Sequence, residues 1–193
     1  MRKSTHSFEP YLEIYRVIRT QKTLRYHLAH SQPARSFVKQ WPQLLKCQFQ
    51  GSGESNIKDT AGSLRYETGG AIRLNPGAGI STHGIVLGTG NTAVALADYK
   101  LETQIAHGAG AGQLSYAIEV FDAFEVVGST ARFRTKRQFS NTSGGTITVK
   151  EAGLYAFDAS SYYFCIARDV LAVPFDIQNA QIAEFRYTLK ATV

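Results

Sequence analysis

The ten residues EFRYTLKATV (184–193) decide the fold class of this chain. Apolar side chains occupy every second position, and the residues between them are charged or carry a hydroxyl group. The apolar positions are Phe185, Tyr187, Leu189, Ala191 and Val193. Because successive side chains of a strand point to opposite faces, this pattern predicts an antiparallel strand with one face in a core and the other in water.

Before this strand the sequence has further short segments of strand-forming residues. These segments are SYAIEVFDAFEVV (115–127), TARFRTKRQFS (130–140), TITVKEAGLYAF (146–157) and YYFCIARDV (162–170). Gly128 and the stretches NTSGG and DASS lie between them and have the composition of turns. The chain of 193 residues is also rich in Gly, Phe and Tyr. Short strands without regular helices between them predict a mainly β domain, an antiparallel β-sandwich or jelly roll.

The first 50 residues have a different periodicity. Between residues 8 and 30 apolar side chains recur at helical spacing, at Tyr11, Tyr15 and Ile18. The stretch ARSFVKQWPQLLKCQF (34–49) has a second apolar set of this kind. Both stretches are therefore predicted to be helical.

The segment GSGES (51–55) has the composition of a linker, and we expect a boundary there. Residues 1–50 are predicted to form a basic, mainly helical N-terminal arm, and residues 51–193 the β domain. The arm has nine Lys or Arg residues and two Glu residues, a balance of +7, whereas the rest of the chain has a balance of −1. All of the excess positive charge is therefore in the arm.

A basic segment of this kind can meet nucleic acid, an anionic membrane surface or an acidic protein surface, and it can also be a solvated helix face. No apolar run has the length of a transmembrane helix, and no apolar stretch follows MRKSTHSFEP (1–10) to complete a signal peptide. Cys47 and Cys165 are isolated thiols, which fits a reducing compartment. We expect no membrane association.

The stretch GIVLGTGNTAV (84–94) contains Gly88, Gly90 and Ala93 at the G-x-G-x-x-A spacing of dinucleotide-binding folds. In such a fold a helix begins at the glycines, so that its free N–H groups face the pyrophosphate. A helix over residues 91–105 is compatible with the composition. However, the acidic residue expected about 20 positions downstream is missing, and hairpins follow instead of strand–helix repeats. We therefore predict no nucleotide site and no cofactor.

Residue types that carry catalysis are present without the spacing that catalysis needs. His83 and His107 are far apart and lack metal-ligand spacing, and no G-x-S-x-G motif occurs. Cys165 stands in an apolar run, which is typical of core packing. Four acidic residues have spacings more typical of solvated surfaces than of acid–base pairs: Asp98, Glu102, Asp122 and Glu125. We predict that the protein is not an enzyme and has no catalytic residues and no metal site.

Several segments together resemble a group of structural proteins from the virions of tailed bacteriophages. The stretches that carry the resemblance are GIVLGTGNTAVALADYKLETQIAHGAGAGQLSY (84–116), RQFSNTSGGTITVKEAGLYAF (137–157), YYFCIARDVLAVPFDI (162–177) and YTLKATV (187–193). The group shares a glycine–threonine turn followed by D-Y-x-L, the hairpin pattern N-x-S-G-x-x-I-T-V-x-E-x-G-L-Y, an A-R-D-V-L and a final alternating strand. The stretch SFVKQWPQLLKCQF is similar to the helical lead-in of the group, whereas VPFDIQNAQIAEF departs from its more regular turn.

The resemblance implies a non-enzymatic component of the virion, assembled in the host cytoplasm. Such a component is a decoration or cement protein, a minor capsid protein, or a ring or adaptor subunit of the tail. Its partners are then major capsid, connector or tail proteins, together with other copies of the chain. We expect the arm to attach the subunit to these neighbours, and contact of the arm with packaged DNA to be the weaker possibility.

The residues expected at this arm interface are of two kinds. Aromatic side chains dominate interface energies and are the expected anchors: Tyr11, Tyr15, Phe37 and Trp41. Basic side chains steer association and form the expected rim: Arg16, Arg19, Lys22 and Arg25.

An alternative from a different class stays open. A jelly roll at the tail tip would bind a host-surface glycan or protein, with NPGAGISTH (75–83) and HGAGAG (107–112) as contact loops. Binding of the isolated protein to host cells distinguishes the two hypotheses, because a cement protein should show none.

Overall fold

The computed structural model describes residues 7–20, 23–34, 36–68, 72–158 and 160–193. Its elements are β1 (Ser7–Phe8), β2 (Tyr11–Arg19), β3 (Leu24–Pro33), α1 (Gln40–Gln50), β4 (Glu54–Lys58), β5 (Leu64–Glu67), β6 (Gly84–Gly88), β7 (Ser115–Phe121), β8 (Glu125–Val127), β9 (Thr130–Ser140), β10 (Ile147–Phe157), β11 (Tyr163–Ile177) and β12 (Ile182–Thr192). The predicted mainly β class is confirmed, because strand residues far outnumber helical residues in the described part of the chain.

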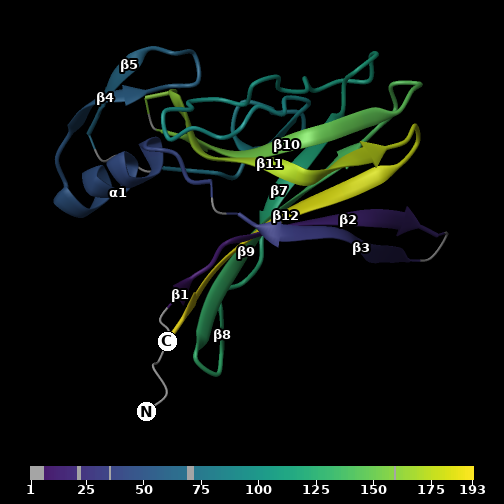
Figure 1. Ribbon diagram of the computed structural model, residues 1–193, viewed down its shortest axis with the longest axis horizontal. Coiled ribbons are helices and arrows are strands. Elements are labelled where there is room, and N and C mark those ends of the chain that lie inside the picture. Colours follow the sequence, from purple (N-terminus) through teal and green to yellow (C-terminus); the bar gives the residue numbers. More distant parts are fainter. Residues whose placement is uncertain (1–6, 21–22, 35, 69–71, 159) are drawn as a thin grey trace.

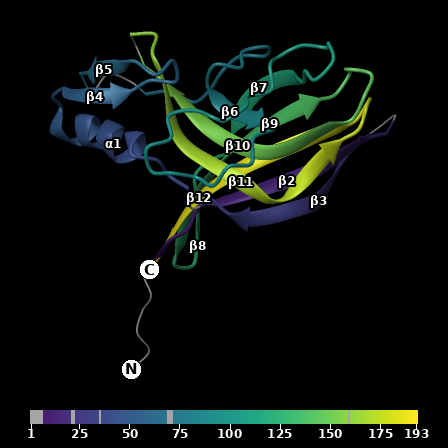
Figure 2. The same ribbon diagram turned by 45° about the horizontal axis from the view of Figure 1, so that its top comes forward.

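Most strands belong to two antiparallel sheets that face each other (Figures 1 and 2). The large sheet has the order β3-β2-β12-β9-β7, with β1 paired to β12 and β8 paired to β9. The small sheet has the order β11-β10-β6, and β4 and β5 form a separate ribbon. One hydrophobic core joins the sheets, and the ring of Phe175 on β11 meets that of Phe185 on β12 at 6.1 Å. This arrangement is compatible with the expected sandwich, and the jelly-roll topology stays a prediction.

Strand β12 has the two faces that its sequence predicts. Phe185 and Tyr187 are fully buried in the core between the sheets. On the opposite face Glu184 is also buried, because side chains of its own sheet cover it. Its carboxylate accepts hydrogen bonds from Gln138 Nε2 at 2.9 Å and Arg186 Nε at 2.6 Å. The polar face is therefore a network of paired charges rather than a freely solvated surface.

The predicted helix over residues 8–30 is wrong. This segment forms the hairpin of β2 and β3, and β2 lies between β3 and β12 in the large sheet. Leu12 and Ile14 of β2 are fully buried in the core. The spacing of Tyr11 and Tyr15 fits a strand as well as a helix, because positions four apart share a face in both. Pairing with β12 and burial of Leu12 and Ile14 favour the strand.

The second predicted helix is confirmed over part of its length. Helix α1 spans Gln40–Gln50 and ends at Gly51, which has a positive φ of 62° and donates its N–H to the carbonyl of Cys47. Residues 36–38 are instead extended beside β11, where Val38 N–H donates to the carbonyl of Ile166. Among the described residues no helix is long and apolar enough to cross a membrane. The division of the chain into two units at residue 50 stays a prediction.

A buried arginine holds the long connection between β5 and β7 against the large sheet. Arg137 on β9 is almost fully buried, and its guanidinium donates to the carbonyl groups of Ala117, His83 and Ile85 at 2.8–3.2 Å. Glu119 on β7 lies close by and accepts the N–H of Ile85 at 2.6 Å. Carbonyl groups that no strand pairs are thereby satisfied inside the protein.

Two phenylalanines on the same face of β9 provide a test of where the core ends. Phe139 is fully buried and contacts the rings of Tyr116 and Phe185 at 4.8 and 5.5 Å, whereas Phe133 is 38% exposed. Phe139→Ala should lower the free energy of unfolding by about 3–5 kcal/mol, because it leaves a cavity. Phe133→Ala should lower it by about 1 kcal/mol or less. Urea denaturation of both variants measures the difference, and equal losses would contradict this boundary of the core.

Candidate functional site

The glycine turn that resembles a dinucleotide motif binds two carboxylates of its own chain. After β6, the Gly90 N–H donates to Glu151 Oε1 at 3.1 Å. The N–H groups of Asn91 and Thr92 both donate to Glu102 Oε2 at 2.9 Å. No helix begins here, since residues 89–104, which we call the glycine loop, are irregular. The N–H groups that would face a pyrophosphate are therefore already paired.

The same carboxylates explain why glycine occupies two positions of the motif. A Cβ atom on Gly88 would lie 2.5 Å from the carboxylate of Glu151, and one on Gly90 would lie 2.6 Å from the carboxylates of Glu102 and Glu151. Contacts below 3.0 Å are not tolerated by real Cβ atoms. The G-x-G spacing thus admits internal acidic side chains instead of a phosphate.

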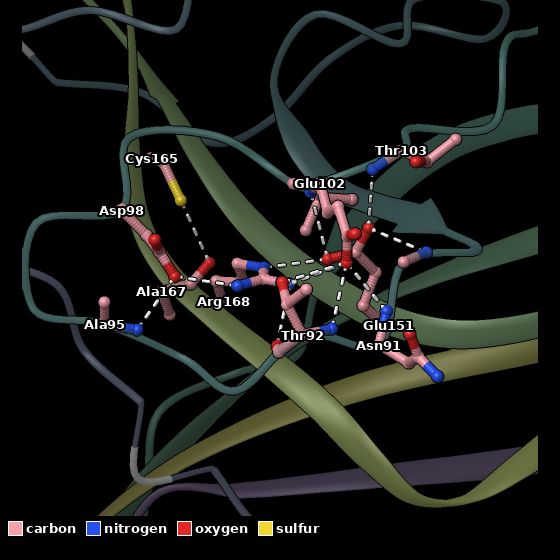
Figure 3. Close-up of polar contacts among 12 residues, drawn as sticks. Asn91, Thr92, Ala95, Asp98, Glu102, Thr103, Glu151, Cys165, Ala167 and Arg168 are labelled. Carbon is pink, nitrogen blue, oxygen red and sulfur yellow. Dashed lines mark hydrogen bonds and ion pairs between the residues drawn. The ribbon is translucent and has the colours of Figure 1, made fainter.

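Arg168 on β11 is at the centre of this cluster (Figure 3). Its Nε donates to Glu151 Oε2 at 2.8 Å, and Nη1 donates to Asp98 Oδ2 at 2.7 Å. Its Nη2 donates to the carbonyl of Thr92 at 3.1 Å and lies 3.7 Å from Glu102 Oε2. Arg168 and Glu151 are both buried between the small sheet and the glycine loop. The guanidinium therefore ties β11, β10 and two parts of the loop together.

The charges of this cluster compensate one another. Burial disfavours the charged form of Arg168, but hydrogen bonds to Glu151 and Asp98 outweigh it and raise the pKa of the guanidinium. Hydrogen bonds from Thr92 lower the pKa of Glu102 below its usual range. Both shifts favour the ordinary ionised states of Arg168 and Glu102, as expected of a structural clamp.

The other reactive side chains that the sequence offered are tied into the fold. Cys165 is fully buried, donates to the carbonyl of Ala167 at 3.4 Å, and burial raises the pKa of its thiol far above the usual range. The His83 ring stacks on the rings of Phe157 and Tyr163, and burial lowers its pKa. The described part of the chain contains no group of three or more His, Cys, Asp or Glu residues placed to hold a metal ion.

A pocket of about 340 Å³ opens beside the glycine loop. Ser81 and Thr82 of the loop over 75–83 line one side, and Tyr163 lines another. The loop over 107–112, the second predicted contact loop, contributes no lining residue. Of the two predicted recognition loops, the one over 75–83 therefore lines this pocket.

The predicted interface residues do not gather on one surface. Tyr11 and Tyr15 lie on the polar face of the large sheet, where Lys190 and Arg186 stand over their rings at 4.7 and 3.8 Å. Arg16 lies on the opposite face, over the ring of Phe175. Arg19, in β2, and Arg25, in β3, are exposed, and Lys22 lies outside the described residues.

Phe37 and Trp41 are the two predicted anchors that the structure brings together. Their ring centroids are 5.3 Å apart, and both side chains pack against the core while staying half-exposed. The ring of Phe8 lies 6.3 Å from Phe37. Phe8 is 56% exposed and was not predicted as an interface residue.

Phe8 belongs to an apolar surface that the small sheet leaves uncovered. Figures 1 and 2 show β1, β8 and the adjoining ends of β9 and β12 projecting away from the facing sheets. One face of this extension is continuous with the core-facing side of the large sheet. On that face, every side chain of the paired residues is apolar. These side chains form the apolar strip: Phe8, Val126, Ala131, Phe133, Leu189 and Ala191. Val126 is 66% exposed, so the strip meets solvent.

The sequence contained a signal for the strip. The alternation of EFRYTLKATV continues past Tyr187, the last buried apolar residue of β12, without any change of pattern. Beyond the small sheet that covers it, the strand could have had polar residues on both faces. Alternation beyond the core therefore marks a second apolar surface, but only the strand pairing shows which residues share it.

Comparison with known proteins adds no further assignment. No protein family model, no curated protein and no solved structure matches the chain.

One further carboxyl group has an unusual environment. Glu67 on β5 is 5% exposed, and its Oε1 has no hydrogen-bond partner among the described residues. Burial, together with a hydrogen bond to the neighbouring carboxyl of Asp158, raises the pKa of Glu67 to about 7. Glu67 therefore holds its proton at a pH where an unfolded glutamate would have lost it.

Replacing Arg168 tests the clamp. Arg168→Met removes the arginine counter-charge of the buried Glu151 carboxyl group, which should lower the free energy of unfolding by about 3–5 kcal/mol. Hydrogen exchange at Gly90 and Thr92 should become faster. Arg132→Met, which breaks a surface ion pair with Glu125, should cost less than about 1 kcal/mol.

A double variant keeps this test informative if the single variant unfolds. Arg168→Met combined with Glu151→Gln removes both charges and should recover part of the lost stability in urea denaturation. A double variant less stable than Arg168→Met alone would contradict the role of Glu151 as the buried counter-charge.

Glu67 makes stability depend on pH. Because its pKa in the folded state is above the unfolded value of about 4.3, its contribution is complete below that value and is lost as the pH rises through 7. The melting temperature of Glu67→Gln should therefore exceed that of the wild type. The difference should grow from pH 5 to pH 8 and reach about a few degrees at pH 8. Glu54→Gln on the paired strand β4 is the control, and thermal melts in which both variants change alike would contradict the effect.

Proposed function

We propose that this chain is a non-enzymatic structural component of a bacteriophage virion that binds a neighbouring subunit through the apolar strip. The observation that carries the proposal is the uncovered core-side face of the extension formed by β1, β8, β9 and β12. A sheet face of this kind loses contact with water when a partner covers it, which stabilises association.

The two faces of the extension differ in a way that supports an interaction surface. The far face has one cross-strand row of charged side chains: Glu125, Arg132 and Lys190. These charges favour contact of that face with water. The apolar strip has no charged member. An apolar face kept free of charge beyond the end of the core is typical of a surface that a partner covers.

The virion assignment rests on the resemblance of about residues 80–193 to phage structural proteins. Decoration or cement protein, minor capsid protein, and tail ring or adaptor subunit are the roles this resemblance implies. Capsid, connector or tail proteins are then the candidate neighbours, and the virion is the location. The buried pair of Arg168 and Glu151, which holds the glycine loop through hydrogen bonds, supports a scaffold rather than a catalyst.

The proposal changes the attachment device expected from the sequence. A separate helical arm cannot serve, because Tyr11–Arg19 and Leu24–Pro33 are strands of the large sheet. Phe37 and Trp41 keep the role of anchors, since Phe8 connects them to the strip. Tyr11 and Tyr15 lie on the other face of the sheet and are not part of this surface.

Recognition of a host surface is the second candidate function. The pocket beside the glycine loop favours it, because Ser81, Thr82 and the Tyr163 ring combine hydroxyl groups with an aromatic wall. Saccharides are recognised by such combinations of polar groups and aromatic faces. Specific binding of the purified chain to host cells would support this candidate over a purely structural role.

Two neighbouring valines on β8 test the proposed function. Val126 and Val127 are 66% and 62% exposed and lie on opposite faces of the extension. Tagged full-length chain is produced in cells infected by the phage that encodes it, and the tag is measured in purified particles. Wild type and Val127→Lys should be incorporated, whereas Val126→Lys should be reduced by about tenfold or more.

Circular dichroism establishes that both variants are folded before they are compared. Absence of the wild-type chain from purified particles would overturn the virion assignment. Equal incorporation of Val126→Lys and Val127→Lys would overturn the role of the strip.

A further inference from the structure

We infer that the apolar strip pairs face to face with the apolar strip of a second copy of this chain, related by a two-fold axis. The inference rests on the proposed function, because it uses the same surface, and it names the occupant. The partner chemistry is therefore another uncharged strip of alternating large and small side chains.

The strip has two rows of different height. Val126, Ala131, Ala191 and Phe8 form one continuous cross-strand row over β8, β9, β12 and β1. Phe133 and Leu189 form the next row, two residues further along β9 and β12. In the middle of the strip, a pair of large side chains thus stands about 7 Å from a pair of alanines.

This arrangement is complementary to itself. A two-fold axis that crosses the strands midway between the rows places Phe133 of one copy over Ala131 of the other, and Leu189 over Ala191. Both contacts then occur twice, as an isologous interface requires. Large side chains fill the low row of the opposite copy, which gives the close packing that stabilises apolar interfaces.

The distribution of charge on the extension also favours a second copy of the chain as the partner. Glu125, Arg132 and Lys190 are on the opposite face, so none of them is desolvated when two strips meet. Within the described residues the strip offers no charge to a strongly acidic or basic partner. A second copy has the matching uncharged surface, whereas a partner chosen by charge has nothing to pair with here.

The size of the strip sets the strength of this pairing. The four strands are about 4.8 Å apart and contribute two to five residues each, which gives a footprint of at most roughly 300 Å² on each copy. Protruding side chains and the neighbouring Phe37 and Trp41 add to it, but the total stays below the roughly 1,200–2,000 Å² of a stable complex. We therefore expect a reversible dimer that forms at micromolar concentrations.

Sedimentation velocity of the full chain at about 5 to 300 µM tests the inference. Wild type and Val127→Lys should change from monomer to dimer over this range. Val126→Lys places a charge in the strip and should weaken the dimer by about tenfold or more. Because both valines are exposed, both variants should keep the circular dichroism spectrum of the wild type.

Three outcomes would overturn the inference. They are a wild type that is monomeric at every concentration, a Val126→Lys variant that dimerises like wild type, and a trimer or larger ring in place of a dimer. The particle experiment separates this failure from that of the proposed function. A monomeric wild type whose Val126→Lys variant is still lost from particles would show that the strip binds a different virion protein.

Discussion

The large sheet extends further than the small sheet that covers it, and this difference in extent determines most of the structure. Where the sheets overlap, alternate side chains of β2, β9 and β12 meet those of β10 and β11 and form the core. Beyond the overlap the same alternation continues, but Phe8, Val126 and Phe133 meet water. One sequence pattern thus stabilises the fold in one region and presents a binding surface in the next.

The parts of the chain without regular strands depend on two buried arginines. Arg137 binds the carbonyl groups of His83, just before β6, and of Ile85, within it, and Arg168 binds the glycine loop after β6. Both guanidinium groups donate hydrogen bonds to backbone carbonyl groups that no neighbouring strand pairs. Each buried guanidinium has a carboxylate close by, Glu119 or Glu151, which limits the cost of placing a charge inside the protein.

The sequence predicted the structure well where the apolar side chains of a segment followed a single spacing. The alternation around Phe185 identified β12, whereas the sequence around Gly88 and Gly90 only argued against a dinucleotide-binding fold, and the absence of a cofactor there stays a prediction. Tyr11 and Tyr15 were misassigned, because a spacing of four residues suits both a helix and a strand. The Arg168 cluster was out of reach, since Asp98, Glu102 and Glu151 come from distant parts of the chain. Likewise the strip joins Phe8 to Val126 and Ala191 only through strand pairing.

The position of β12 has a consequence for how the protein is made. Strand β2 pairs with β3 on one side and with β12 on the other, so Val17 must meet Ile182 across almost the whole chain. During synthesis the first hairpin emerges long before β12 does, and a lone hairpin is only marginally stable in water. Leu12 and Ile14 therefore lack their final neighbours until translation is nearly complete. Contacts so distant in sequence make closure of the large sheet the slow step of folding.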